Sequence, residues 1–88
     1  MADRIRLNIL TANGGMERMV SYVSLPAAGG SIGILAGHVP MLCALEEGTV
    51  RYRCGQGELQ SVQTGAGVAR VGDNEVLLLV SHVTEPEA

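Results

Sequence analysis

The sequence of 88 residues contains no lysine, no tryptophan and no phenylalanine, and it has only two tyrosines. The absence of lysine excludes a P-loop, a lysine Schiff base and a carrier domain that bears lipoyl or biotin on lysine. Long apolar runs are also missing. The longest, residues 76–80, has the length of a strand, whereas a membrane-spanning helix needs about 20 residues.

The charges are few, and they lean to the acidic side. Six arginines face nine acidic residues, which gives a net charge of −3. Because clustered cations and stacking aromatics are both missing, nucleic acid is not expected as a partner. The first residues lack the apolar core of a signal peptide, so we expect none. Two cysteines without a secretory context indicate a reducing cytoplasm.

What the chain does contain is aliphatic side chains, 47% of residues being apolar, and 12 glycines. This composition excludes a disordered tail, and the length is that of one domain. Apolar and polar residues alternate with period 2 between turn signals rich in glycine, a pattern that predicts β-strands. The sequence therefore predicts an all-β sandwich or barrel. The expected strands cover residues 4–10, 18–25, 31–35, 41–45, 49–54, 59–64, 68–71 and 75–83.

Three of these strands carry more specific predictions. The strand 18–25 should direct Met19 or Val20, and then Tyr22, inward. Residues 41–45 and 49–54 flank a short turn that ends in Gly48, so they are expected to form a hairpin. The last strand is apolar on both faces over residues 76–80, which places it in the middle of a sheet.

Metal or disulfide chemistry would have to use the histidines and cysteines, which are His38, His82, Cys43 and Cys54. Their spacings match none of the tight ligand pairs of structural zinc sites. Cys43 and Cys54 lie almost symmetrically about the predicted hairpin turn, so a cross-strand disulfide is geometrically allowed. The favoured interpretation is that both are small apolar residues in a reducing compartment.

Catalytic arrangements have little support in the sequence. Ser31, His38 and Asp73 could be drawn as a triad, but no nucleophile-elbow motif accompanies them. The adjacent pair Glu46 and Glu47 lies in a predicted turn, where side chains are normally solvated. The glycine pairs precede no helix that could bind phosphate. We therefore expect no enzyme, no metal and no cofactor.

The segment 30–40 is unusually apolar and glycine-rich for a connection that faces solvent. One interpretation is internal: Gly33 and Gly37 permit a bulge and a turn. The other is that the segment packs against another protein, with its exposed isoleucine and leucine side chains in the interface. The residues alone favour neither interpretation.

The same segment carries a family resemblance. It reads Gly30-x-x-Gly33-Ile34-Leu35-x-Gly37-His38-x-Pro40, preceded by Val-Ser-Leu-Pro at 23–26 and followed by Gly-x-Val-Arg at 48–51 and Gly-x-Gly-Val at 65–68. In this order, from about residue 7 to 83, the motifs resemble the N-terminal β-sandwich domain of the epsilon subunit of F-type ATP synthases. The resemblance implies a two-sheet sandwich of about ten short strands.

The resemblance also implies a function. It is that of a non-catalytic central-stalk (rotor) subunit, which joins the gamma subunit to the membrane c ring below the catalytic head, so that ion translocation drives ATP synthesis. The chain would then be a peripheral protein on the cytoplasmic face of the cell membrane, without lipid insertion. The partner-interface residues it implies are Ser31, Ile32, Gly37, His38, Met41, Leu42 and Cys43.

Some features depart from the family. Members often carry Glu at the position of Ser31, Pro at Ala36 and Thr at Cys43. Residues 1–84 are expected to form the sandwich domain, and 85–88 a tail or the start of a linker. The two-helix C-terminal domain of many bacterial members has no counterpart in this sequence, so neither inhibition by those helices nor nucleotide binding is expected. The alternative is a free β-sandwich adaptor unrelated to energy coupling.

Overall fold

The structure is a computed structural model that describes residues 4–38 and 40–85. This part of the chain contains no helix, and so none that could cross a membrane. It forms ten strands: β1 (Ile5–Thr11), β2 (Gly14–Val20), β3 (Tyr22–Ala27), β4 (Gly30–Leu35), β5 (Met41–Leu45), β6 (Gly48–Arg53), β7 (Leu59–Thr64), β8 (Gly67–Gly72), β9 (Glu75–Val80) and β10 (Val83–Thr84). The all-β prediction is confirmed.

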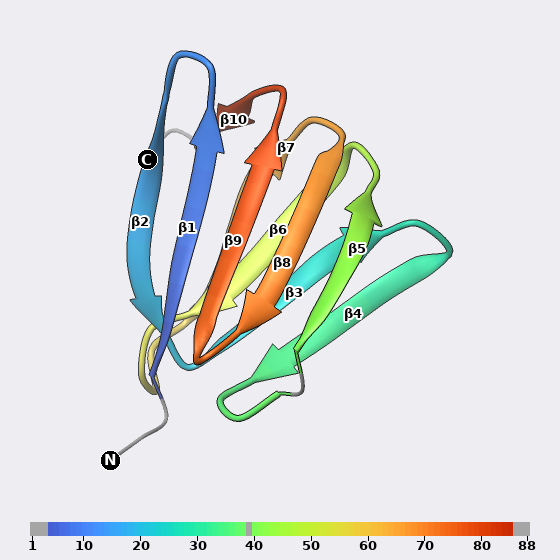
Figure 1. The fold of residues 1–88 in the computed structure, drawn as a ribbon. Helices are drawn as coiled ribbons and strands as arrows, with labels where there is room; N and C mark the ends of the chain where they lie inside the picture. The colour runs from blue at the N-terminus through green and yellow to red at the C-terminus, as the bar shows by residue number, and fades with distance from the viewer. Residues whose placement is uncertain (1–3, 39, 86–88) are drawn as a thin grey trace.

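The ten strands form two layers that face each other (Figure 1). The front layer has the order β5-β8-β9-β1-β2, and the back layer has the order β4-β3-β6-β7-β10. Neighbouring strands are antiparallel except for β1 and β9, which pair in parallel. The strand β9 lies in the middle of the front layer, as its sequence predicted. The predicted strand 75–83 is nevertheless two strands, because the chain leaves the front layer after Val80 and pairs with β7 in the back layer as β10.

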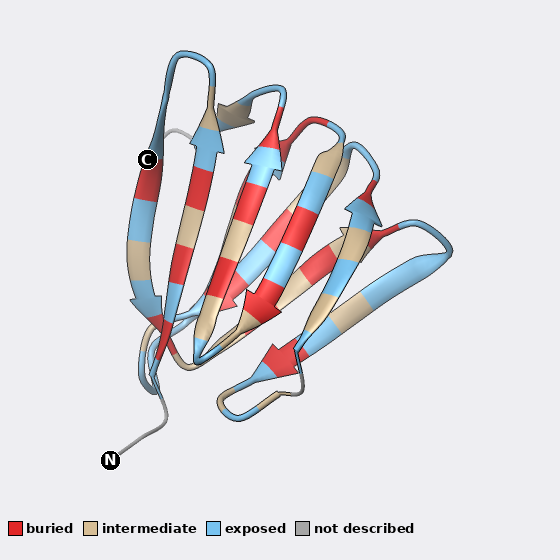
Figure 2. Ribbon diagram, in the orientation of Figure 1, coloured by how far each residue is buried: buried red, intermediate tan, exposed pale blue. Residues whose placement is uncertain are grey.

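The core lies between the layers and is almost entirely aliphatic. Inward positions alternate with outward ones, which Figure 2 shows as bands of buried and exposed residues along most of the strands. Val50 and Tyr52 of β6 are buried, and Cys54, two residues after Tyr52, is partly buried and packs against the core. The side chains that are at most 1% exposed include Ile5, Leu7, Ile9, Val23, Leu25, Ile34, Val62, Val76 and Leu78.

The predicted strand 18–25 is in fact two strands in different layers. The chain leaves the front layer after Val20 and enters the back layer at Tyr22. Ser21 at the break donates its backbone N–H to Arg53 O at 2.7 Å and its hydroxyl to Gly55 O at 2.7 Å. This crossing shifts the alternation: Val20, one of the two predicted inward positions, does face the core, but Val23 follows it there in place of Tyr22, for which the prediction is wrong.

The prediction that residues 41–45 and 49–54 form a hairpin is also wrong. The strand β5 pairs with β8 in the front layer, whereas β6 pairs with β7 and β3 in the back layer. The short connection between them crosses from one layer to the other, and Glu46 N–H donates to Pro26 O at 2.9 Å on the way. So short a connection is compatible with both geometries, so the turn signal alone could not distinguish a hairpin from a change of layer.

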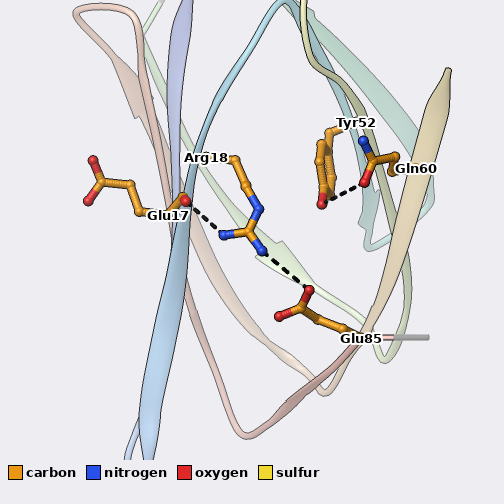
Figure 3. A network of polar contacts seen from close by, with 5 residues as sticks. All are labelled: Glu17, Arg18, Tyr52, Gln60 and Glu85. Atoms are coloured by element: carbon orange, nitrogen blue, oxygen red, sulfur yellow. Dashed lines mark hydrogen bonds and ion pairs between the residues drawn. The ribbon is translucent and has the colours of Figure 1, made fainter. Parts of the chain in front are cut away.

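Polar contacts close one side of the sandwich, between the edge strands β2 and β10 (Figure 3). The Arg18 guanidinium forms an ion pair with Glu85, which follows β10, at 3.3 Å, and it also donates to Glu17 O at 2.9 Å. Nearby, the Tyr52 hydroxyl meets Gln60 Oε1 at 3.5 Å. Both members of the ion pair are about half exposed, so the pair contributes at most about 1 kcal/mol.

Two glycines of β8 should respond very differently to alanine. A Cβ at Gly67 would overlap the backbone carbonyl oxygen of Leu79 on the neighbouring strand, whereas a Cβ at Gly72 would meet Pro40 Cβ at an ordinary 3.7 Å. We expect Gly67→Ala to lower the free energy of unfolding by about 2–3 kcal/mol. Gly72→Ala, the control, should change it by less than about 0.5 kcal/mol in a urea titration. Equal effects would contradict the close packing of β8 on β9.

The core also contains one polar side chain whose hydroxyl lacks a hydrogen-bond partner among the described residues, Thr64, which is 1% exposed. Replacing it by the isosteric valine removes the desolvated hydroxyl, so Thr64→Val should raise the free energy of unfolding by about 1 kcal/mol. Thr49→Val on the adjacent strand is the control, because Thr49 Oγ1 accepts a hydrogen bond from Gln63 at 2.8 Å and should not gain stability. If Thr64→Val instead lowered the free energy of unfolding, the Thr64 hydroxyl would have to form a hydrogen bond in the folded protein.

Candidate functional site

The outer face of the front layer carries large apolar side chains in exposed positions. The register places Ala44, Val68, Leu79 and Leu10, from four adjacent strands, directly opposite one another in one line. All four are exposed. With strands about 4.8 Å apart, this line extends about 15 Å across the sheet. We call these four residues the outer apolar row.

The lines of residues next to the outer apolar row are progressively more polar. The first combines Leu42 and Leu77 with Arg70, Asn8 and Glu17. In the second, Glu75 lies opposite Arg6, and Arg6 forms an ion pair with Glu17 at 3.4 Å. The face is therefore apolar toward one end of the strands and charged toward the β8–β9 turn.

A shallow depression of about 520 Å³ lies at the charged end of this face. It is lined by the start of β5 and by the β8–β9 hairpin, including Met41, Arg70, Asp73 and Glu75. The depression is open and mixed in character, whereas small-molecule sites are mostly enclosed and apolar. Its position makes it an extension of the same outer face.

The outer apolar row was not among the sequence predictions, although one signal for it was present. The run 76–80 is apolar on both faces and was interpreted as a central strand. Val76, Leu78 and Val80 do lie in the core, but Leu77 and Leu79 face outward, and Leu79 is 47% exposed. In a two-layer sandwich the outer face of a central strand has no third layer, so apolar residues there indicate a binding surface.

The seven predicted interface residues occupy three kinds of position. Leu42 lies on the outer face, next to the outer apolar row, and is 74% exposed. Ile32, Met41 and Cys43 are partly buried and pack against the core. Ser31, Gly37 and His38 lie at the ends of β4, with Ser31 and Gly37 exposed and His38 half-buried.

The two ends of β4 are far apart, and so are the predicted residues on them. Ser31 follows the β3–β4 turn, while Gly37 and His38 follow the opposite end of the strand (Figure 1). Ser31 and Leu35 are separated by about 13 Å along an extended strand. The structure therefore does not bring Ser31 and His38 into one site, and the triad considered with Asp73 is not assembled.

The cysteines and histidines are likewise dispersed. Cys43 lies on β5 of the front layer and Cys54 follows β6 of the back layer, and both are free thiols. His82 lies beyond β9, where its Nδ1 meets Ser81 Oγ at 3.3 Å. In the described ranges, no three side chains of the His, Cys, Asp or Glu type are grouped so as to hold a metal ion. The surface offers contact area rather than reactive groups.

Comparison with known families settles the classification of this sandwich. The family model described as "ATP synthase, Delta/Epsilon chain, beta-sandwich domain" matches residues 4–86. The chain belongs to this family. An ATP synthase epsilon chain of Desulfitobacterium hafniense is 32% identical over 87 residues, which are 98% of this chain and 64% of that protein. A chloroplastic ATP synthase epsilon chain of Cyanidioschyzon merolae is 37% identical over 82 residues, 92% of this chain and 62% of that protein.

Solved structures share the family fold. A chain in the Euglena gracilis mitochondrial ATP synthase (OSCP/F1/c-ring) has a TM-score of 0.86 at 20% identity, over 97% of this chain and 54% of that one. A chain in the central stalk and c-ring structure of the Tetrahymena thermophila mitochondrial ATP synthase has a TM-score of 0.77 at 15% identity, over 92% of this chain and 66% of that one. At these identities the likeness shows the delta/epsilon fold. The chain spans about two thirds or less of the length of these relatives.

Adjacent leucines on β9 provide a test of which side of the delta/epsilon sandwich is core. Leu78 is fully buried and Leu79 is 47% exposed. We expect Leu78→Ala to lower the free energy of unfolding by about 2–5 kcal/mol, because it leaves a cavity between the layers. Leu79→Ala should cost less than about 1 kcal/mol in the same denaturant titration. Similar losses for both variants would mean that a further segment covers the outer face.

Proposed function

We propose that this chain is a non-catalytic central-stalk subunit of an F-type ATP synthase, which joins the gamma subunit to the c ring so that ion translocation drives ATP synthesis. Membership of the delta/epsilon β-sandwich family supports this role, and the two similar solved assemblies are described as containing a c ring, one of them with the central stalk. The observation that carries the proposal for this molecule is the outer apolar row, an exposed apolar surface on a rigid sheet.

The outer apolar row and Leu42 are the contact that we assign to gamma. The row provides the apolar centre, and Arg70 and Glu75 provide the charged margin that stable protein interfaces have around such a centre. Gly37 is hydrogen-bonded to Asn74 in the β8–β9 turn, beside the charged end of this face, so we extend the contact to Gly37 and His38. Ile32, Met41 and Cys43 support it from the core side, where they hold β4 and β5 in place.

The opposite end of β4 is the contact that we assign to the loops of the c ring. Ser31 lies there, exposed, beside the β3–β4 turn. The separation of Ser31 from His38 supports two contacts rather than one, as a subunit that joins two partners requires. With a net charge of −3, the chain is suited to contact with protein loops rather than with anionic lipid.

Under this proposal the chain itself catalyses nothing. The outer face offers exposed apolar side chains for contact, and the described residues include no group of three His, Cys, Asp or Glu side chains that could hold a metal ion. The chain would act at the cytoplasmic face of the cell membrane as a peripheral part of the complex, with the sandwich of residues 1–84 as its working unit and without a bound nucleotide.

The assignment of the gamma contact can be tested with two leucines of equal exposure on opposite faces. Leu79 on the front layer is 47% exposed, and Leu59 on β7 of the back layer is 46% exposed. In a titration of this chain with the gamma subunit of the same organism, Leu79→Asp should weaken binding at least about tenfold, because it buries an unpaired charge. Leu59→Asp should bind gamma as the unmodified chain does, and the thermal melts of both variants should match it.

Two outcomes would contradict the proposal at different levels. If the unmodified chain and gamma elute separately in size-exclusion chromatography at tens of micromolar, the rotor role fails and an adaptor role takes its place. If gamma binds but Leu59→Asp and not Leu79→Asp disrupts the complex, the rotor role stands and the contact lies on the back layer.

A further inference from the structure

Two turns from different layers meet at one end of the sandwich. The β4–β5 connection begins with a turn over residues 35–38, in which His38 N–H donates to Leu35 O at 3.1 Å. Gly37 has φ +82°, the value that a type II turn requires at its third position. The β8–β9 hairpin turns through Asp73 and Asn74, which have φ +53° and +57°, as in a type I′ turn.

Asn74 connects these turns through two separate groups. Its side-chain Oδ1 accepts a hydrogen bond from Gly37 N–H at 2.9 Å. Its backbone carbonyl accepts one from Arg6 N–H at 2.9 Å, at the start of β1. One residue thus ties the β4–β5 connection to β9 and β1.

The hydrogen bond between Asn74 and Gly37 connects the two layers at a point where no pair of strands connects them. The strand β4 is an edge strand of the back layer that pairs with β3, whereas β9 and β1 are central strands of the front layer. The gap beneath the two turns, lined by Ile34, His38 and Asn74 among others, has a volume of only about 10 Å³. Such a gap holds no more than about one water molecule, so the turn is seated closely on the end of the core.

We infer that Asn74 is a positioning residue, which holds the turn of Gly37 and His38 in line with the outer face of the front layer. The inference rests on the proposed function, because that surface is the one assigned to gamma. An interface formed by residues on two layers is continuous only if the layers keep a fixed relative position. The Asn74 side chain provides that constraint at the end of the face where His38 lies.

The residue type at position 74 allows the backbone and side-chain roles to be separated. A left-handed backbone is tolerated by Asn, Asp and Gly. Asn74→Gly therefore keeps the hairpin turn but removes the acceptor for Gly37 N–H. Asn74→Asp keeps both the turn and an acceptor oxygen, and it is the matched control.

The experiment measures two quantities for each variant of this chain. The first is amide hydrogen exchange at Gly37, followed by NMR on the chain alone. The second is the affinity for gamma, measured by calorimetry. We expect Asn74→Gly to remain folded, to exchange at Gly37 about tenfold faster and to bind gamma more weakly by a similar factor. Asn74→Asp should match the unmodified chain in both measurements.

The two measurements distinguish a failure of this inference from a failure of the proposed function. Unchanged Gly37 exchange in Asn74→Gly would overturn the inference, and so would faster exchange with undiminished gamma affinity. If the unmodified chain does not bind gamma at all, the proposed function fails, and the exchange measurement alone decides whether Asn74 holds the turn.

Discussion

The two-layer structure depends on the hydrogen bonds of one strand, β3. Along one edge β3 pairs with β4, and along the other it pairs first with β6 and then, at Ala27, with Leu45 of β5. Pairing with β6 anchors β3 in the back layer, and pairing with β5 connects it to the front layer. Val23 and Leu25 are fully buried at this junction. The core can close because the strand that joins the layers also contributes to their packing.

Sequence reasoning located the strands but not all of their partners. Alternation with period 2 predicts both that a strand forms and which of its residues face the core, as it does for Val50 and Tyr52. This is possible because the pattern depends only on local geometry. Partner choice depends on distant segments. At Ser21 and at Glu46 the chain changes layer within one or two residues, and the local pattern of a layer change resembles that of a continuous strand or a tight hairpin. Both errors arose at these points, and the predicted strand 75–83 was divided into β9 and β10 at a third change of layer, at Ser81 and His82.

The candidate surface was only partly predictable for a related reason. Leu42 could be identified, since it belongs to the segment that resembles the epsilon family. The outer apolar row could not, because its members lie on four strands and become neighbours only through the register. Leu77 and Leu79 carried a visible signal, an apolar outer face, that burial under a third layer would explain equally well. The contact between Asn74 and Gly37 left no sequence signal, because turn residues are chosen for their backbone angles first.

The direction of the outer apolar row has a mechanical consequence. Hydrogen bonds between antiparallel strands lie perpendicular to the strands. The outer apolar row also crosses the strands, so it lies parallel to these hydrogen bonds. A force on the row that acts along the strands loads the bonds of several strand pairs in shear, and they must fail together. A force along the row itself can separate one strand pair at a time. The sandwich is therefore stiff in one direction of load and weaker in the other.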